Sequence, residues 1–326
     1  MIKKLLLEKS INNGLKEFFP KTEVAKKDIL IEPSTKHASL LGNSYDLMLS
    51  CMLGINNTYL QTQVFKPFEV AIESLSESFV EGNTVLYYKG VGYPLSEKFI
   101  TINDLLKDKN VLNQFPEQEH ITTNTQVFEL LSDAQVKLED IFTKKKILKT
   151  HLKSLIIASQ ILPAFSMRKF AKNVGVVEDD LINLLNDLKQ ATSKELISQA
   201  KEILINPHIH YSIVDGRPDY VFHNTILDIK TTKKFFARIH LNQVLIYFLL
   251  HLSKETESDF RNYDSDFSER NIDEIALYYP LYGTVIKINM IETYGEEIIQ
   301  KALLWFNNEL TLFAKNKLGL KGRNKS

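Results

Sequence analysis

The stretch PDYVFHNTILDIK, residues 218–230, restricts the fold of this chain more than any other segment. Two short runs of β-branched and aromatic residues flank the polar pair His223-Asn224, a pattern that predicts a hairpin with a two-residue turn. Each run also carries an aspartate, a residue that is depleted in strands. The sequence therefore predicts a small piece of sheet that holds two carboxylates for a reason other than strand stability.

A turn at His223-Asn224 fixes the strand register, and Asp219 is then expected opposite Asp228. Directly opposed side chains have Cβ atoms about 4.5–5.5 Å apart. Because side chains alternate along a strand, Lys230 shares the face of both aspartates. The other pairs predicted by this register are Tyr220 with Leu227, Val221 with Ile226 and Phe222 with Thr225.

Two carboxylates at this distance repel each other and destabilise a sheet. A divalent cation removes that cost, and ligands that are all oxygens favour a hard ion such as Mg²⁺ or Mn²⁺. Lys230 would then orient or help activate an attacking water, or stabilise charge that develops on phosphate oxygens. A surface hairpin with a solvated Asp228–Lys230 pair is the structural alternative that this spacing leaves open.

Three segments around the hairpin occur in a suggestive order: GRPD at 216–219, DIKTT at 228–232 and QVLIY at 243–247. Together they resemble the PD-(D/E)xK nuclease superfamily, specifically its RecB-like branch with the QxxxY motif. The resemblance covers about 205–290 and 38–53. It implies that Asp219, Asp228 and the carbonyl of Ile229 bind the metal and that Lys230 is the catalytic lysine. It also implies that Gln243 and Tyr247, which share one helical face, complete the site and contact the nucleic-acid backbone.

The chain departs from the family pattern in two places. The family has an upstream GxxxH helix, whereas the corresponding segment here, Gly42 to Asp46, ends in an aspartate. Asp46 is a candidate further metal ligand, with a helix-surface position as the alternative and His37 as a weaker substitute. The only cysteine is Cys51, so the four-cysteine iron–sulfur cluster of some relatives is not expected.

Lysine and arginine balance aspartate and glutamate at 40 each, so any nucleic-acid site must be a local basic patch. Lys233, Lys234 and Arg238 follow the DxK strand and are candidates to neutralise phosphates. Two further basic runs, 144–153 and 168–172, are more typical of solvated helix faces. No GxxxxGK[ST] loop is present, so an ATPase or helicase would have to act as a separate partner.

The chain has 326 residues, of which 44% are hydrophobic, enough for one large or two ordinary domains. Helical periodicity dominates up to about residue 203, and strand patterns follow it. We therefore expect an α+β fold: a restriction-endonuclease-like core with a small mixed central sheet flanked by helices, and a large helical insertion. The expected division is 1–58 for N-terminal helices of the core, 59–203 for the insertion, 204–316 for the nuclease core and 317–326 for a flexible basic tail.

The expected function is a divalent-metal-dependent nuclease acting on DNA rather than RNA, in prokaryotic defence or DNA repair. A catalytically silent protein that binds nucleic acid or a partner on the same fold is one alternative, and a sequence-specific restriction-type endonuclease is another. No apolar run approaches the roughly 18 residues of a membrane span, and the N-terminus lacks a signal-peptide core. The expected compartment is the cytoplasm, without a membrane partner.

Overall fold

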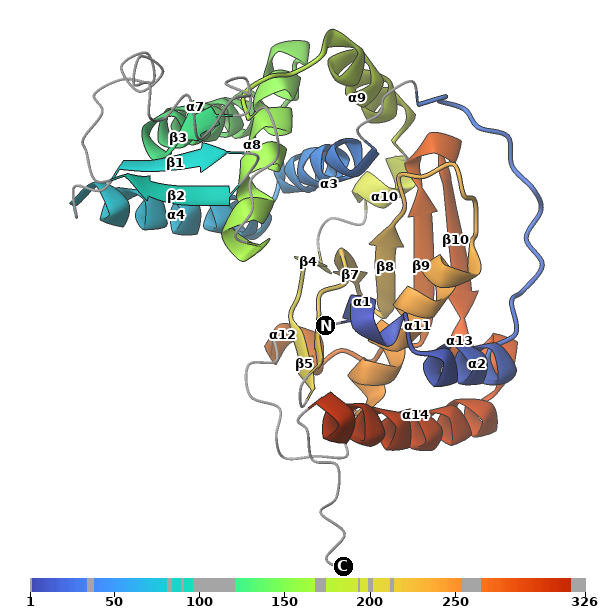
Figure 1. The fold of residues 1–326 in the computed structure, drawn as a ribbon. Helices are drawn as coiled ribbons and strands as arrows, with labels where there is room; N and C mark the ends of the chain where they lie inside the picture. The colour runs from blue at the N-terminus through green and yellow to red at the C-terminus, as the bar shows by residue number, and fades with distance from the viewer. Residues whose placement is uncertain are drawn as a thin grey trace, which may run out of the picture. The chain divides into compact units, whose positions relative to one another are not determined.

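The computed structural model describes residues 2–33, 38–80, 84–88, 91–95, 121–167, 174–192, 194–198, 202–211, 214–253 and 265–317. The chain divides into two compact units, drawn in Figure 1. Unit 1 combines Met1–Leu30 with Ser193–Ser326, and unit 2 is Ile31–Thr192.

Unit 1 is built on a five-stranded mixed sheet with the strand order β10-β9-β8-β7-β4. The central pair, β8 and β9, is parallel, and the other neighbours are antiparallel. Parallel neighbours need a crossover connection, and the long helix α11 lies between β8 and β9 in sequence. A separate hairpin is formed by β5 and β6. The strands are β4 (Ile203–Ile205), β5 (Ile209–Tyr211), β6 (Val214–Gly216), β7 (Tyr220–Phe222), β8 (Thr225–Ile229), β9 (Glu274–Tyr279) and β10 (Thr284–Asn289).

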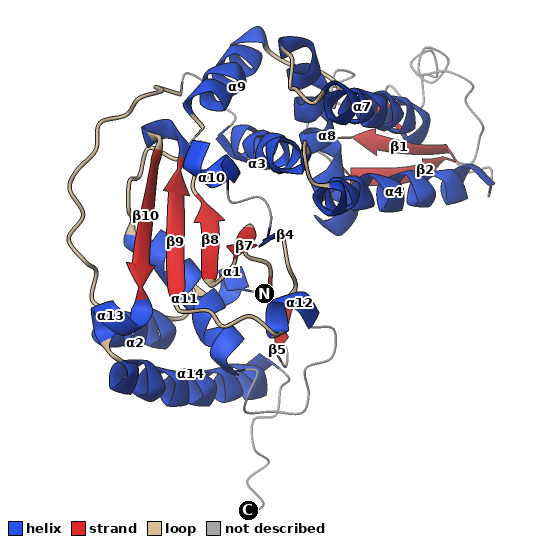
Figure 2. Cartoon of the chain, turned by 180° about the vertical axis from the view of Figure 1, so that it is seen from behind, coloured by secondary structure: helices blue, strands red, loops and turns tan. Residues whose placement is uncertain are grey.

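Helix α11 packs on one face of this sheet, as Figures 1 and 2 show from opposite sides. Most residues of α11 are buried and apolar, which is typical of a helix that packs on more than one side. All residues of β8 are buried as well, Asp228 among them. The helices of unit 1 are α1 (Ile2–Leu5), α2 (Lys9–Phe18), α10 (Lys194–Ser198), α11 (Arg238–Ser253), α12 (Ser265–Ser268), α13 (Met290–Tyr294) and α14 (Glu296–Lys317), with the 3₁₀ turn η4 (Pro280–Tyr282).

The N-terminal segment returns to this unit, as the sequence predicts. Helix α2 packs against α14 and α11. The contact with α14 is close at Gly14, where an added Cβ would lie 2.0 Å from Cζ2 of Trp305. A glycine at this position lets the indole ring lie directly on the helix backbone.

Unit 2 consists mainly of helices, together with a three-stranded antiparallel sheet of order β2-β1-β3 that the sequence did not predict. Two of its strands lie at 84–88 and 91–95, around a segment whose glycines and proline are more typical of turns. The elements are α3 (Ala38–Gly54), α4 (Thr58–Val80), β1 (Thr84–Tyr88), β2 (Val91–Leu95), β3 (Ile121–Thr123), α7 (Asn124–Lys144), α8 (Lys149–Met167) and α9 (Asp179–Ala191).

The division between the units differs from the expected domain bounds at α3. The sequence assigned 1–58 to the nuclease core, whereas α3 packs with α4, α7, α8 and α9 inside unit 2. The physical reason is its apolar surface: buried side chains occur at almost every position of its second half, so it needs helices on several sides. The bound at 203 shifts as well, because unit 1 begins again at Ser193.

The observed fold class is α+β, with a small mixed sheet flanked by helices. This confirms the predicted class at that level. Among the helices that the structure describes, none combines the length and apolar character needed to cross a bilayer.

Candidate active site

The hairpin of β7 and β8 has the register that the two-residue turn predicts. Tyr220 pairs with Leu227, Val221 with Ile226 and Phe222 with Thr225. The turn residue His223 has a φ of 41°, in the left-handed region that such tight turns require. The predicted register is therefore confirmed for all three strand pairs.

Asp219 lies one residue before β7, where regular pairing with β8 has ended. Its backbone oxygen accepts a hydrogen bond from the N–H of Asn206, which extends the contact of β7 with β4. Its carboxylate oxygen Oδ2 accepts the backbone N–H of Ile229 at 2.6 Å. The side chain thus replaces a ladder hydrogen bond, and this holds the Asp219 carboxylate at the end of β8.

Asp228 is the most deeply buried charged group of the site, with 1% of its side chain exposed. Its carboxylate forms an ion pair with the ammonium of Lys230, which is 16% exposed. Burial raises the pKa of Asp228, against the attraction of Lys230 and a hydrogen bond with the Asp219 side chain, which both lower it. Asp228 and Lys230 therefore meet on one face, as the alternation along β8 predicts, and the Asp219 side chain joins them.

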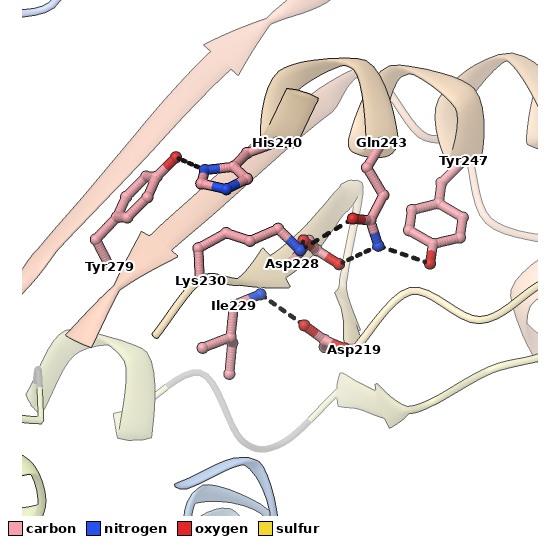
Figure 3. A network of polar contacts seen from close by, with 8 residues as sticks. All are labelled: Asp219, Asp228, Ile229, Lys230, His240, Gln243, Tyr247 and Tyr279. Atoms are coloured by element: carbon pink, nitrogen blue, oxygen red, sulfur yellow. Dashed lines mark hydrogen bonds and ion pairs between the residues drawn. The ribbon is translucent and has the colours of Figure 1, made fainter. Parts of the chain in front are cut away.

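Helix α11 adds Gln243 and Tyr247 to this group (Figure 3). The Gln243 amide bridges the site: its Oε1 accepts a hydrogen bond from Lys230 at 3.1 Å, and its Nε2 donates to Asp228 Oδ1 at 3.3 Å. The same Nε2 lies 3.2 Å from the hydroxyl oxygen of Tyr247. Burial, followed by the nearby Asp228 charge, raises the pKa of Tyr247, so its hydroxyl stays protonated.

The position of Tyr247 depends on Gly216, the last residue of β6. An added Cβ at Gly216 would lie 3.0 Å from Cε1 of Tyr247 and 2.4 Å from Cδ1 of Ile2. Only a residue without a side chain allows both groups to approach the β6 backbone this closely. The glycine of the GRPD segment thus acts through packing.

His240 and Tyr279 belong to the same neighbourhood and were missed by the sequence analysis. His240 lies on α11 and its Nδ1 is 3.0 Å from the hydroxyl of Tyr279 on β9 (Figure 3). Burial, followed by the charges of Lys230 and Lys234, lowers the pKa of His240 to about 4. The sequence does contain a pattern that indicates His240, because His240, Gln243 and Tyr247 have the i, i+3, i+7 spacing of one helical face.

The donor set of this site fits a hard divalent cation. Asp219 and Asp228 supply carboxylate oxygens, and the buried Oδ2 of Asp228 lies in ion-pair contact with the Lys230 ammonium. Across the described ranges, no three His, Cys, Asp or Glu side chains gather as a metal site. A cation would therefore take two carboxylates and complete its shell with a backbone oxygen, water and substrate oxygens, as Mg²⁺ commonly does. The role of the Ile229 carbonyl stays a prediction.

Other candidate residues have different positions. Lys233 and Lys234 are exposed in the loop after β8. Arg238 instead donates from its guanidinium to the backbone oxygens of Phe19, at 2.6 Å, and Leu15. These oxygens belong to the carboxyl end of α2, so Arg238 caps that helix, and its role as a phosphate ligand stays a prediction.

Asp46 lies on α3 in unit 2 and is partly buried, so its role as a further metal ligand stays a prediction. His37, the basic run 168–172 and the tail 318–326 lie outside the described residues. Of the run 144–153, Lys144 pairs with Asp140 at 2.8 Å and Lys149 donates to Asn183 at 2.9 Å. These contacts give both lysines partners within unit 2.

Comparison with known proteins found no match to a family model, no similar curated protein and no similar solved structure. The functional interpretation therefore depends on the geometry of the site and on the sequence motifs.

Proposed function

We propose that this protein is a divalent-metal-dependent nuclease of the PD-(D/E)xK type. The observation that supports this most is the network in which Gln243 joins Lys230, Asp228 and Tyr247, next to the carboxylate of Asp219. Two acids, a lysine and a bridging amide meet where a sheet strand and a helix adjoin. Burying such a set without a ligand costs free energy, which suggests a catalytic role.

In this proposal Asp219 and Asp228 hold the cation, whose charge would polarise the scissile phosphate and lower the pKa of a bound water. Lys230 stabilises negative charge on the phosphate oxygens and orients the attacking water. Gln243 acts as a positioning residue, because its amide fixes both the ammonium of Lys230 and the carboxylate of Asp228. The protonated hydroxyl of Tyr247 completes this chain of hydrogen bonds and is a candidate contact to the nucleic-acid backbone.

DNA is the favoured substrate, and Lys233 and Lys234 are the proposed contacts to its phosphates. Both lysines are exposed and lie three and four residues after Lys230. This places positive charge close to the acidic pair, where a polyanion has to enter. A role in prokaryotic defence or repair would suit such an activity.

The decisive experiment is a cleavage assay with the full chain on single-stranded DNA, duplex DNA and RNA, in Mg²⁺, Mn²⁺ or EDTA. We expect metal-dependent cleavage of DNA that Asp228→Asn and Lys230→Ala each abolish. Lys287→Ala is the matched control, because Lys287 is exposed on β10 of the same sheet.

Two outcomes would count against the proposal. A wild type that cleaves none of these substrates in either metal would contradict it. Binding of nucleic acid that persists unchanged in all variants, without cleavage, would favour a catalytically silent binding protein. Cleavage confined to one short duplex sequence would instead indicate a restriction-type enzyme within the same class.

A further inference from the structure

His240 occupies an unusual position beside the proposed site. It lies on α11 one turn before Gln243, and its ring is only partly buried. Its Nδ1 is 3.0 Å from the Tyr279 hydroxyl, and the two ring centroids are 5.9 Å apart. Among the described residues, no hydrogen-bond partner is found for the other ring nitrogen, Nε2.

The hydrogen bonds around Tyr279 determine which ring nitrogen of His240 carries the proton. The side chain of Tyr279 is fully buried, so its hydroxyl hydrogen needs an acceptor inside the protein. Its oxygen accepts the backbone N–H of Phe236. The acceptor left for its hydrogen, within the part of the chain that is described, is Nδ1 of His240. A neutral imidazole with an occupied Nδ1 acceptor carries its proton on Nε2 and donates from there.

The loop that follows β8 is held in place next to this imidazole. The Phe235 ring packs on Tyr279 and Tyr282, with centroid distances of 5.0 and 4.7 Å. The Tyr282 hydroxyl donates to the backbone oxygen of Lys233 at 2.6 Å. Phe236 has a φ of 42°, a conformation that a bulky residue adopts only when its surroundings impose it. The loop therefore presents Lys233 and Lys234 from a fixed backbone.

We propose that Nε2 of His240 and the ammonium of Lys234 form a phosphate-binding subsite, adjacent to Lys230, for a second phosphate of the bound strand. The chemical class of ligand is a nucleic-acid phosphodiester. The inference rests on the proposed function, since the strand is taken to pass Lys230. Tyr279 is the positioning residue, because it fixes the ring and its tautomer.

A neutral donor suits this location. Lys230 and Lys234 already place positive charge near the ring, and a third cation would add repulsion in the absence of substrate. A fixed Nε2–H contributes a directed hydrogen bond to an anionic oxygen without that repulsion. Removing such a hydrogen bond is expected to weaken binding roughly tenfold.

The test measures binding and cleavage separately, using three substitutions of His240 in the full chain. Glutamine places an amide N–H near the position of Nε2, asparagine places one near Nδ1, and alanine removes both. Binding of a short single-stranded DNA oligonucleotide is measured by fluorescence anisotropy in EDTA, where no cleavage occurs. We expect Kd to rise roughly tenfold for His240→Ala and His240→Asn, and to stay within about twofold for His240→Gln. Tyr279→Phe is expected to weaken binding by a smaller factor, because the ring loses its fixed tautomer.

Each result bears on one claim. Equal binding by wild type and His240→Ala overturns the subsite, and equal behaviour of the Gln and Asn variants overturns the assigned tautomer. A variant that fails to fold is recognised by its lowered thermal midpoint. If His240→Ala fails to fold, His240→Gln is compared with wild type in its place. The outcomes for the subsite and for the nuclease proposal can be told apart. If the protein cleaves DNA but Kd does not depend on His240, only the subsite is contradicted. If Kd depends on His240 but no cleavage occurs, only the nuclease proposal is contradicted. A wild type that neither binds nor cleaves removes both.

Discussion

Buried polar side chains are used differently in the two units. In unit 2, His151 contacts Asp140 at 2.8 Å and accepts the backbone N–H of Leu148 at the start of α8. Gln160 accepts the N–H of Gly175 and donates to the oxygen of Val176, both at 2.8 Å. These side chains satisfy backbone groups at helix ends and loops, which is the usual task of a buried polar side chain.

In unit 1, the polar contacts around Asp228 run from side chain to side chain. Lys230 and Gln243 bind its carboxylate, and the amide continues to Tyr247. Such a cluster closes no helix and no turn, and a buried ion pair contributes less to stability than an apolar group of similar volume. The difference is that the polar groups named in unit 2 also bind backbone groups, whereas those around Asp228 bind one another, and the proposed function accounts for this second arrangement.

The largest expected effect is a loss of cleavage without a loss of stability, on substitution of Asp228. Asp228→Asn should reduce metal-dependent cleavage by about 10³-fold or more, because several kcal/mol of charge stabilisation is lost. The thermal midpoint should not fall. A raised folded-state pKa means that folding becomes less favourable as pH rises through the unfolded value, and asparagine has no such cost at pH 7.

Asp140→Asn in unit 2 is the matched substitution. Hydrogen bonds from Lys144 and His151 lower the pKa of Asp140, so its charge contributes stability above the unfolded pKa. We expect a lower thermal midpoint and unchanged cleavage. Calorimetry and the cleavage assay together check both variants, and a stability loss in Asp228→Asn equal to that in Asp140→Asn would remove the contrast between the units.

The second prediction concerns the positive charges around the site. Arg238→Ala should lower the free energy of unfolding by about 1.5–3 kcal/mol, because charged hydrogen bonds to the end of α2 are lost. It should leave the salt dependence of DNA binding unchanged. Lys233→Ala and Lys234→Ala should do the reverse, each reducing the slope of log K against log salt by about one. An Arg238 variant with a reduced slope would restore it as a phosphate ligand.

The sequence predicted those parts of the site that depend on local geometry. Alternation along β8 and the two-residue turn predicted the shared face of Asp228 and Lys230. Asp219 lies beyond the paired residues, and its carboxylate is held by the backbone N–H of Ile229. The position of Gln243 followed from the motif. The contacts of Arg238 could not be predicted from the sequence, because its partners, at the end of α2, are more than 200 residues away. The sequence alone does not distinguish a charged residue that faces solvent beside a motif from one that caps a distant helix.

The missed elements have a similar cause. Tyr279 is on β9, and its contact with His240 exists only because β9 lies parallel to β8 on the face that α11 covers. The placement of α3 in unit 2 was also decided by tertiary contacts, since an apolar helix can pack equally well against a sheet or against other helices. Periodicity identifies such an element but does not select its neighbours.

A third, smaller effect is expected at Gly216. Alanine there would bring a Cβ within 3.0 Å of the Tyr247 ring, which has to shift, whereas Ile2 can move its flexible end. We expect a loss of about 1–2 kcal/mol in stability and a several-fold loss of cleavage, as overpacked sites usually show. The matched glycine of unit 2 is Gly54, where an added Cβ would meet Phe142 at 3.1 Å. Gly54→Ala should lower stability without reducing cleavage at saturating metal and substrate, and a loss of cleavage there would contradict the separation of roles.

The smallest expected effect is a pH dependence of folding that originates at His240. Its pKa in the folded protein is about 4, below the ordinary histidine value, so between about pH 6.5 and 4 the unfolded chain binds a proton that the folded chain does not. Stability should therefore fall as pH is lowered through this window, and the partial exposure of the ring keeps the change small. Denaturant titrations of wild type and His240→Gln at pH 7 and 5.5 isolate this contribution, since other groups titrate in both proteins. Equal losses in the two proteins would mean that burial and the charges of Lys230 and Lys234 do not hold the ring neutral, and the contrast between the two units would then rest on Asp228 alone.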